Sequence, residues 1–341
     1  MEGKRDVGNA GDGDVRELQG KLSAVLAELR KVVVGQEEVM EQVLMALFCR
    51  GHALLVGVPG LAKTLLVSSV SRTLDLENRR VQFTPDLMPS DITGAELLEV
   101  DQGSGARHFR FAPGPVFANL LLADEVNRTP PKTQAALLEA MQEEQVTVGG
   151  KSYPLPDPFV VLATQNPIEQ EGTYPLPEAQ LDRFLFSIKI DYPAMEEERE
   201  IIRRVTGGEM PSLEKLLDQE EIRRMRDLVG QVPAAEHVID YAAKLVRASR
   251  PGEDGAPDFV TEHVEWGAGP RAGIALVTAG KARAVMRGRL HVTTADIAAV
   301  ALPVLRHRIV TGFTAEAAGL NSDEIIRQLL EVVTLEEELA L

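Results

Sequence analysis

The sequence predicts an α/β fold, in which a mostly parallel sheet is covered by helices on both faces and is followed by a separate all-α domain. Between residues 51 and 190, five short apolar runs alternate with helical patterns, which is typical of buried parallel strands. From about residue 212 onward, apolar residues recur at helical spacing without a convincing strand. The five strand-like runs are HALLVGV, RRVQFTP, ANLLLADE, FVVLATQN and FLFSIKI.

The expected domain boundaries follow changes in composition along the chain. Residues 1–14 are polar and glycine-rich, which indicates a disordered tail. Residues 15–192 contain two amphipathic helices and the strand-like runs, and we expect them to form the sheet domain. Residues 193–212 are predicted to be a linker, and residues 213–341 a helical domain.

Two segments of the sheet domain interrupt the alternation of strands and helices. One lies near residues 95–116 and has a glycine- and serine-containing centre, and the other lies near residues 146–156 and contains Gly149 and Gly150. Both are predicted to be inserted hairpins, because such turns favour glycine between β-prone runs. In the helical domain, Thr294 precedes an apolar helical face and is the predicted N-cap.

The composition argues against several classes of protein. A net charge of −16, with 52 acidic and 36 basic residues, disfavours a surface that holds a nucleic-acid backbone. Cys49 is the single cysteine, so no intrachain disulfide can form, and the six histidines lack the spacing of zinc ligands. The N-terminus has no signal-peptide core, and no apolar run approaches the roughly 18 residues of a membrane span. We therefore expect a cytoplasmic protein without a membrane span or a nucleic-acid partner.

Residues 57–64 read GVPGLAKT and lie between an apolar run and a helical pattern. They match the phosphate-binding pattern G-x-x-x-x-G-K-[ST] at Gly57, Lys63 and Thr64. In that context the backbone N–H groups of the loop and the following helix N-terminus bind phosphate. Lys63 is expected to bridge the β- and γ-phosphates of a nucleotide, and Thr64 to bind Mg²⁺. The alternative, an ordinary glycine-rich turn, is weaker in this strand-loop-helix context.

Ala62 stands where the phosphate-binding pattern has its second glycine. We predict that Ala62 lies where the loop turns into the helix and that its φ is negative, which would tolerate the methyl group. Gly57 and Gly60 would then allow the tight turn and the close approach of phosphate.

Polar residues follow two later strand-like runs. Asp124 and Glu125 end ANLLLADE, where Asp124 would orient Mg²⁺ and Glu125 would polarise the attacking water. Asn166 ends FVVLATQN and could position that water beside the γ-phosphate. Taken singly, the carboxylates could belong to a solvated turn and Asn166 could cap a turn before Pro167. Downstream of a phosphate loop, the catalytic interpretation is favoured.

Two arginines are candidates for contacts with phosphate. Arg183 lies just before the last strand-like run, and it could be an arginine finger that reaches the γ-phosphate, often from a neighbouring subunit. Its alternative role is a surface ion pair with Asp182. Arg271 opens a helix after GAGP, where its charge opposes the helix dipole, so an anion outside the helix is a reasonable explanation.

In this order the motifs resemble those of the AAA+ ATPases, and specifically the MoxR family in the helix-2-insert branch. VVGQEEV is similar to the segment that contacts adenine, and GVPGLAKT is similar to the MoxR Walker A loop, in which alanine commonly replaces the glycine. LLADEVNRTPPKTQAALLEAMQE resembles the Walker B region. LATQNP, LPEAQLDRF and PRAGIAL resemble sensor 1, the arginine-finger segment and sensor 2. The resemblance covers nearly the whole chain.

The resemblance implies a P-loop AAA+ αβα sandwich with a five-stranded parallel sheet and a C-terminal helical lid. It places the two hairpins at the helix-2 and pre-sensor-1 insertions of this branch. It implies ATP and Mg²⁺ as cofactors and a homo-oligomeric ring, usually a hexamer. The implied function is an ATPase, producing ADP and phosphate, that matures or activates protein complexes in a chaperone-like manner, with partners that often carry a von Willebrand factor A domain.

The motifs and the resemblance together define a set of expected site residues. The catalytic residues are Glu125, Asn166, Arg183 and Arg271, and the magnesium ligands are Thr64 and Asp124. The nucleotide-binding residues are Val34, Gly35, Gln36, Gly57, Val58, Pro59, Gly60, Leu61, Ala62, Lys63, Thr64, Leu65 and Asp124.

Two other classes of motor share parts of this pattern. A DNA-acting AAA+ motor has the same insertions, and the first insert here carries Arg107, His108 and Arg110. The acidic total and the aromatic content of 4% count against it, because few rings are available to stack on bases. A magnesium-chelatase-like motor subunit has a similar core, but it needs a catalytic partner subunit and this chain has no evident porphyrin-handling feature.

Overall fold

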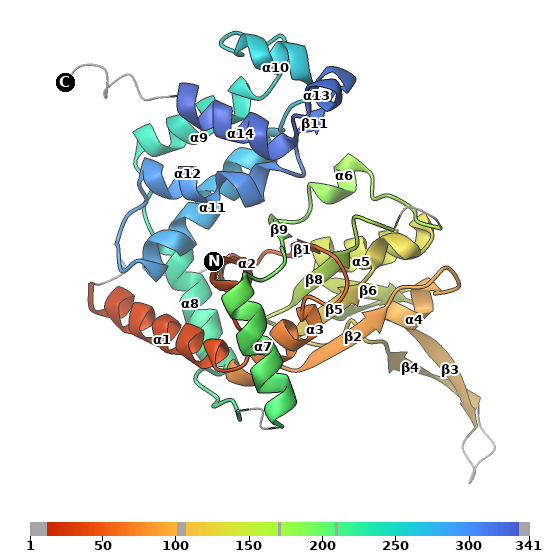
Figure 1. The fold of residues 1–341 in the computed structure, drawn as a ribbon. Coiled ribbons are helices and arrows are strands. Elements are labelled where there is room, and N and C mark those ends of the chain that lie inside the picture. The colour runs from red at the N-terminus through yellow and green to blue at the C-terminus, as the bar shows by residue number, and fades with distance from the viewer. Residues whose placement is uncertain (1–11, 101–106, 170–171, 209–210, 334–341) are drawn as a thin grey trace, which may run out of the picture.

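The computed structural model describes residues 12–100, 107–169, 172–208 and 211–333 of the protein. The sheet domain and the helical lid pack against each other, and the lid elements α9 to α14 gather at one end of the molecule (Figure 1). Most of the tail predicted over residues 1–14 lies outside the described residues. Residues 12–14 begin helix α1 (Asp12–Arg30).

All five predicted strands form one parallel sheet in the order β2-β5-β8-β1-β9. This sheet and the helical C-terminal region confirm the predicted fold class. The register aligns the carboxyl ends of the strands, since Gln82 pairs with Asp124 and Val56 pairs with Gln165. Polar residues at these ends therefore face a common edge. The strands are β1 (Ala53–Val56), β2 (Asn78–Gln82), β5 (Leu120–Asp124), β8 (Val160–Gln165) and β9 (Phe186–Lys189).

Helices cover both faces of the sheet, which explains why the inner strands β5, β8 and β1 are largely apolar, whereas the edge strand β2 is mostly polar and exposed. Successive side chains of β1 point to opposite faces, so Leu54 belongs to one buried cluster and Leu55 to the other. Leu54 packs in the cluster that contains Leu137 of α5, whereas Leu55 packs in the cluster that contains Leu66 of α3. The helices of this domain are α2 (Glu37–Phe48), α3 (Lys63–Thr73), α4 (Pro89–Thr93), η1 (Val126–Arg128), α5 (Pro131–Glu143) and α6 (Glu178–Leu181).

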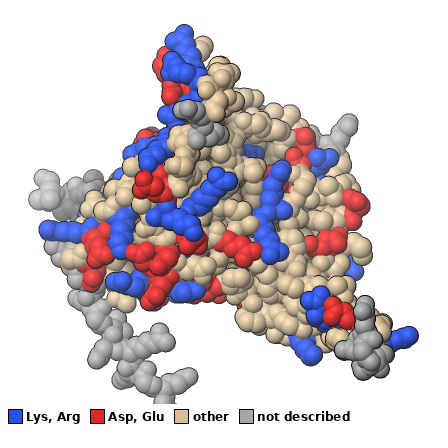
Figure 2. Space-filling model, turned by 90° about the horizontal axis from the view of Figure 1, so that it is seen from below, with Lys and Arg blue, Asp and Glu red and all other residues tan. Residues whose placement is uncertain are grey.

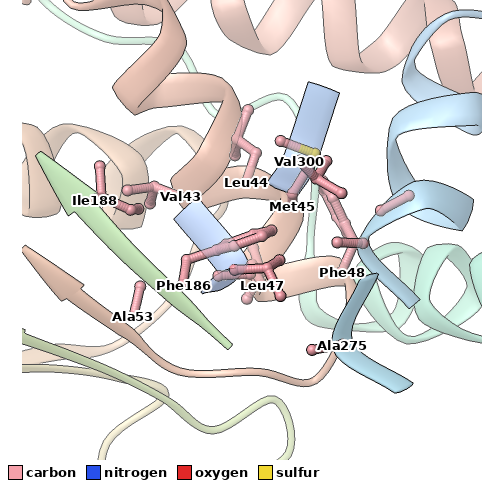
Figure 3. Close-up of a cluster of buried hydrophobic side chains, with 14 of the residues drawn as sticks. Val43, Leu44, Met45, Leu47, Phe48, Ala53, Phe186, Ile188, Ala275 and Val300 are labelled. Carbon is pink, nitrogen blue, oxygen red and sulfur yellow. The ribbon is translucent and has the colours of Figure 1, made fainter. Parts of the chain in front are cut away.

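Helix α2 is buried between the sheet and the lid. Nine of its twelve residues are buried, and its side chains lie between Phe186 and Ile188 of β9 on one side and Ala275 and Val300 of the lid on the other (Figure 3). One continuous cluster of buried apolar residues therefore runs from the sheet through α2 into the lid. This cluster fixes the position of the lid relative to the sheet.

Both predicted hairpins are present. β3 (Gly94–Val100) pairs antiparallel with β4 (Arg107–Pro113), and β6 (Gln145–Val148) pairs with β7 (Lys151–Pro154). The β3–β4 hairpin projects away from the sheet domain (Figure 1).

The two hairpins contact each other near the base of β4. The rings of Phe111 and Tyr153 stack with centroids 4.0 Å apart, and Phe111 also meets Phe117 edge-on at 5.4 Å. Gly149 has a φ of +58° and lies so close to the carboxylate of Glu96 that a Cβ would collide with it. Contacts between side chains, above all the stack of Phe111 on Tyr153, thus join the two hairpins.

The segment 193–212, predicted to be a linker, contains helix α7 (Met195–Gly207). Its residue Arg204 donates hydrogen bonds to the carbonyl oxygens of Lys31 at 2.7 Å and Arg30 at 3.2 Å, at the C-terminal end of α1. A guanidinium at that position also interacts favourably with the helix dipole of α1. Helix α7 is therefore attached to the sheet domain beside the loop that follows α1.

The lid consists mainly of helices, but two predictions about it were wrong. A short antiparallel pair of strands, β10 (Val264–Trp266) and β11 (Val310–Thr311), occurs where no strand was predicted, because elements of three and two residues are too short to show a period. The N-cap of α12 is Thr293 rather than Thr294, because the Asp296 carboxylate accepts from the N–H of Thr293 at 3.0 Å. The lid helices are α8 (Gln219–Gln231), α9 (Glu236–Ala248), α10 (Asp258–His263), α11 (Pro270–Met286), α12 (Thr294–Leu305), α13 (Phe313–Ala318) and α14 (Ser322–Val332).

Charges of both signs are mixed on the face shown in Figure 2, where lysine and arginine side chains alternate with acidic ones. Several of them form ion pairs between elements, such as Lys21 of α1 with Glu221 of α8 at 2.7 Å. Among the helices of the described residues, none is both long and apolar enough to cross a membrane.

Candidate nucleotide site

The loop between β1 and α3 forms one wall of the candidate site. Gly57 follows β1, and a Cβ there would lie 2.6 Å from the carbonyl oxygen of Ile190, so only glycine fits without displacing the chain. Gly60 has a φ of +86°. Close packing at Gly57 and a left-handed backbone at Gly60 therefore both favour glycine.

Ala62 contradicts the predicted backbone conformation. Its φ is +56° and its ψ is +23°, so it adopts the left-handed conformation that the prediction of a negative φ excluded. Ala62 is the N-cap of α3, and no side chain caps this helix. The first N–H groups of α3 consequently point into the loop without a side-chain acceptor, which is the arrangement that binds phosphate at a helix N-terminus. The prediction was wrong because Ala62 is the N-cap and lies outside α3, which begins at Lys63, so the helical φ does not apply to it.

Lys63 begins α3, and its ammonium group is held within the loop. It donates to the carbonyl oxygen of Gly57. Burial lowers the pKa of Lys63, and the negative charges of Asp124 and Glu125 act in the opposite direction. The ammonium therefore lies between the loop and the two carboxylates, where phosphate oxygens would replace the Gly57 carbonyl as acceptors.

Asp124 ends β5 and is held by groups from both neighbouring strands. Thr164 of β8 donates its hydroxyl to Oδ1 at 2.6 Å, and Arg80 of β2 donates through Nη2 to Oδ2 at 2.6 Å. The same Thr164 oxygen accepts from the N–H of Glu125 at 2.8 Å. Thr164 thereby fixes the backbone and the carboxylate at the end of β5 together.

Glu125 adopts a left-handed backbone with a φ of +57° and accepts two hydrogen bonds on Oε2. The donors are Gln82 Nε2 at 2.7 Å and Arg128 Nη1 at 3.0 Å. Among the described residues no hydrogen bond to Oε1 occurs, so that oxygen remains available to a water molecule. The carboxylate is oriented at one oxygen and can act as a base at the other.

Asn166 follows β8 and is buried to 5% exposure. Its Oδ1 accepts from the N–H of Ile168 at 3.2 Å, which is the turn-capping role considered as the alternative. Asn166 also lines the same cavity as Lys63 and Glu125. Asn166 therefore caps the turn and lines the site at the same time, because the hydrogen bond to the turn orients its side-chain amide.

These residues surround one cavity of about 460 Å³. The predicted site residues that line it come from the loop, α3, β5 and the end of β8, and Arg80, Gln82 and Thr164 complete the wall. Gly57 and Val58 do not line the cavity. The predicted residues that line it are Pro59, Gly60, Leu61, Ala62, Lys63, Thr64, Leu65, Asp124, Glu125 and Asn166.

A second, more apolar hollow of about 110 Å³ adjoins the first across Gly60 to Leu65. Val34 and Gln36 line it, as predicted from the resemblance, whereas Gly35 lies beside it with a φ of +66°. Its opposite wall comes from helix α7 and from Pro193, two residues before the helix begins. These wall residues are Pro193, Ile201, Arg204 and Val205.

The two hollows fit a nucleoside triphosphate with a divalent cation. The helix N-terminus without a side-chain cap and the Lys63 ammonium suit a polyphosphate, and the apolar hollow suits a base. Thr64 and Asp124 offer a hydroxyl and a carboxylate oxygen, which are the hard ligands that Mg²⁺ prefers. The groups that line the two hollows are therefore of the kinds that ATP and Mg²⁺ require.

Comparisons with known proteins agree with this geometry. The family model described as "ATPase family associated with various cellular activities (AAA)" matches residues 52–186, and a model of the AAA lid domain matches residues 259–329. Chaperone MoxR1 of Mycobacterium tuberculosis is 43% identical over 92% of this chain and 82% of its own length. Protein MoxR of Methylorubrum extorquens is 31% identical over 95% of this chain and 96% of its own. The chain belongs to the MoxR family of AAA+ ATPases.

A solved structure supports the same assignment of fold. A crystal structure of a protein from Cytophaga hutchinsonii superposes with a TM-score of 0.86 at 44% identity, covering 94% of this chain and 96% of that one. The protein YeaC of Bacillus subtilis is 38% identical over 93% of this chain and 95% of its own. The helical lid and the αβα domain are thus the two parts of an AAA+ fold.

The two predicted arginines of this MoxR protein do not line its nucleotide cavity. Arg183 lies between α6 and β9, and Arg271 lies in the first turn of α11 in the lid. Both flank Asp182, since Arg271 Nη1 lies 3.6 Å from Asp182 Oδ2. The alternative pairing of Asp182 with Arg183 is not found, because the carboxylate instead binds Arg308 at 2.7 Å and faces Arg271.

Sequence reasoning missed several residues of the MoxR site. The strand register brings Arg80 and Gln82 beside the Walker B carboxylates, and a polar pair alternating within a strand was the available signal. For Thr164, the only signal in the sequence was a single polar residue within an apolar run. No local pattern marked α7 as a wall of the base hollow, because its contribution depends on the chain returning past α1.

Proposed function

We propose that this protein hydrolyses ATP to ADP and phosphate in a Mg²⁺-dependent reaction and uses the cycle to remodel, mature or activate protein complexes. The observation that carries the chemical part is a single cavity that gathers Lys63, Thr64, Asp124, Glu125 and Asn166 from separate elements. The work on protein complexes rests on membership of the family and on the chaperone named among its relatives.

Each residue has a definite task in this proposal. The N–H groups of α3 and the Lys63 ammonium would bind the phosphates, and Thr64 and Asp124 would hold the cation. Mg²⁺ bound there supplies positive charge at the phosphate oxygens. Glu125 takes a proton from the attacking water at Oε1 while Gln82 and Arg128 hold Oε2. The Asn166 amide orients that water.

The proposed site is shared between copies of the chain. Neither Arg183 nor Arg271 lines its own cavity, and both lie beside Asp182. A neighbouring copy would bring this pair to the γ-phosphate, where added positive charge stabilises the transition state. Repeating that head-to-tail contact closes a ring, for which six copies are expected. Partners with a von Willebrand factor A domain remain the expected clients from the resemblance.

The substitution Glu125→Gln tests the chemical proposal. The amide keeps the shape, and its oxygen can still accept from Gln82 and Arg128, but it cannot take a proton, so hydrolysis should fall roughly 100-fold or more while ATP still binds. Turnover is measured by phosphate release and binding by calorimetry. Glu139→Gln, an exposed position on α5, is the matched control and should leave both unchanged. Undiminished phosphate release in Glu125→Gln would remove Glu125 as the base.

A further inference from the structure

Three consecutive lid residues, Arg306, His307 and Arg308, bind the main chain of the segment that carries Arg183. They follow helix α12, and their side chains donate to carbonyl oxygens between Asp182 and Ser187. We call these three residues the lid clamp. The contact joins two parts of the chain more than 100 residues apart in sequence.

Arg308 is the centre of the lid clamp, because all five of its N–H groups are paired. Nε donates to Asp182 Oδ1 at 2.7 Å, and Nη2 donates to the carbonyl oxygens of Asp182 at 3.1 Å and Phe184 at 2.7 Å. Nη1 donates to the carbonyl oxygens of Leu185, at 3.3 Å, and Val304. The side chain is only 4% exposed. A lysine has three donors without this planar fork and cannot make the same set of bonds.

The other two clamp residues extend the contact along the same segment. His307 donates from Nε2 to the carbonyl oxygen of Phe184 at 3.0 Å, which requires the tautomer with the proton on Nε2. Arg306 donates to the carbonyl oxygen of Ser187 at 2.9 Å and to Asp323 Oδ1 at 3.0 Å. Lys189 of β9 donates to the other oxygen of Asp323 at 2.7 Å, so the lid and β9 are joined again.

Asp182 connects the lid clamp to the second arginine. Its Oδ1 accepts from Arg308, and its Oδ2 faces Arg271 at 3.6 Å. Arg183 is the next residue along the chain. The main chain of Arg183 and the helix that carries Arg271 are therefore fixed to each other through one carboxylate and one buried guanidinium.

The side chain of Arg183 lacks such support of its own. It is half-buried, and among the described residues no hydrogen bond or ion pair to its guanidinium occurs. Its position is thus set by its main chain, which the lid clamp holds. Displacing a group that must meet a reacting phosphate by about 1 Å can cost roughly 100-fold in rate.

We propose that the lid clamp, and Arg308 above all, is a positioning device that holds Arg183 and Arg271 as one rigid pair for presentation to the nucleotide of a neighbouring copy. The proposal rests on the shared site proposed above. It requires that damage to the clamp impairs a subunit as a donor of arginines and leaves the same subunit able to bind ATP and to hydrolyse it when its neighbour is intact.

Mixed assemblies separate these two roles. Arg183→Ala subunits keep a complete nucleotide cavity but lack one arginine of the donated pair, and Lys63→Ala subunits donate both arginines but do not hydrolyse. Mixing the two should restore phosphate release. The test replaces the donor by the double variant Lys63→Ala, Arg308→Lys, which should reduce the restored rate at least tenfold.

The reciprocal mixture distinguishes positioning from general damage. The double variant Arg183→Ala, Arg308→Lys serves as the acceptor beside a Lys63→Ala donor. We expect its rate to match that of Arg183→Ala within about twofold and its ATP Kd to be unchanged. Arg287→Lys, which alters an exposed ion pair with Glu41, is the matched control and should be silent in both roles.

Each outcome bears on one proposal. No restored rate at any ratio of Arg183→Ala to Lys63→Ala would overturn the shared site. A restored rate that is insensitive to Arg308→Lys in the donor, or equally sensitive in the acceptor, would overturn the lid clamp alone. If Arg308→Lys fails to fold, His307→Leu and His307→Gln replace it in the donor. Leucine should lower the restored rate, and glutamine, which can still donate to the Phe184 carbonyl, should retain it; equal rates would overturn the proposal.

Discussion

Ala62 is a non-glycine residue in the left-handed region, at the turn from the phosphate loop into α3. A side chain in that region costs about 1–2 kcal/mol, and the loop retains it between Gly60 and the first turn of the helix. A negative φ was expected to make the alanine methyl group acceptable at this position. Because φ is positive, the methyl group is accommodated for a different reason. The alanine is strained, and the surrounding loop keeps it in place.

Replacing Ala62 with glycine should relieve this strain. Because glycine adopts a positive φ freely, Ala62→Gly should stabilise the protein by about 1 kcal/mol and raise the unfolding temperature by about 2 °C. ATP affinity should stay within about tenfold, or 1.4 kcal/mol. Thermal unfolding and calorimetric titration measure the two quantities.

Ala135→Gly provides the control with the opposite sign. Ala135 is exposed in the interior of α5, where glycine should destabilise by about 1 kcal/mol. If Ala62→Gly destabilises the protein to the same extent as Ala135→Gly, the left-handed conformation of Ala62 is wrong.

Single residues of the site were predictable where a fixed spacing carries the chemistry. Lys63, Thr64 and the Asp124–Glu125 pair follow strand ends in a recognisable order, and they meet in one cavity. Arg80 was not predictable, because its hydrogen bond to Asp124 depends on the strand register between β2 and β5, which places Gln82 opposite Asp124 and Arg80 two residues earlier. Register depends on packing across the whole sheet, which a local pattern does not contain.

Among the elements, the two inserted hairpins form one unit through the stack of Phe111 on Tyr153. Helix α5 runs from the Walker B region to β6, so the same unit adjoins the chain that carries Glu125. A hairpin anchored in this way can follow movements near the nucleotide.

Phe111→Ala should loosen the β3–β4 hairpin. Loss of the stack and of the contact with Phe117 should raise amide hydrogen exchange in β3 and β4 about tenfold, while ATP affinity stays unchanged. Phe109→Ala is the control, because Phe109 lies on the same strand but is 69% exposed. Equal protection of the hairpin in Phe111→Ala and the native protein would show that the stack does not anchor it.

Elements were predictable when they were long or repeated a clear period. All five sheet strands and both hairpins were recognised in this way. The strands β10 and β11 were not, because two or three residues show no alternation. Helix α7 lies in the segment predicted as a linker. It has a short apolar face that includes Ile201 and Val205, but none of its residues is buried in the core.

At the scale of the whole molecule, the placement of Arg271 decides how copies cooperate. The sequence left open whether this residue serves its own nucleotide or a neighbour's. Its position beside Asp182, away from the cavity lined by Lys63, favours the neighbour. The position depends on how the lid packs over α2, which the sequence alone did not predict.

Arg271→Ala should therefore weaken assembly more than nucleotide binding. In a Glu125→Gln background with ATP, sedimentation velocity should show smaller assemblies than Glu125→Gln alone, since the arginine no longer bridges to a neighbour's phosphate. The ATP Kd of the separate chains should change less than about threefold. Arg247→Ala, at an exposed lid residue paired with Glu253, is the control. Lost ATP affinity with unchanged assembly would place Arg271 at its own nucleotide.

Helix α2, lying between β9 and the lid, has a consequence for how the chain can be divided (Figure 3). Its buried side chains belong to a single cluster that includes both domains, so neither domain has a complete core without it. The AAA+ domain and the lid follow each other along the chain but share this cluster, so we expect them to unfold together. A fragment cut at the domain boundary would expose the face of α2 that packs against the lid, and it would lose the lid side chains that cover that face.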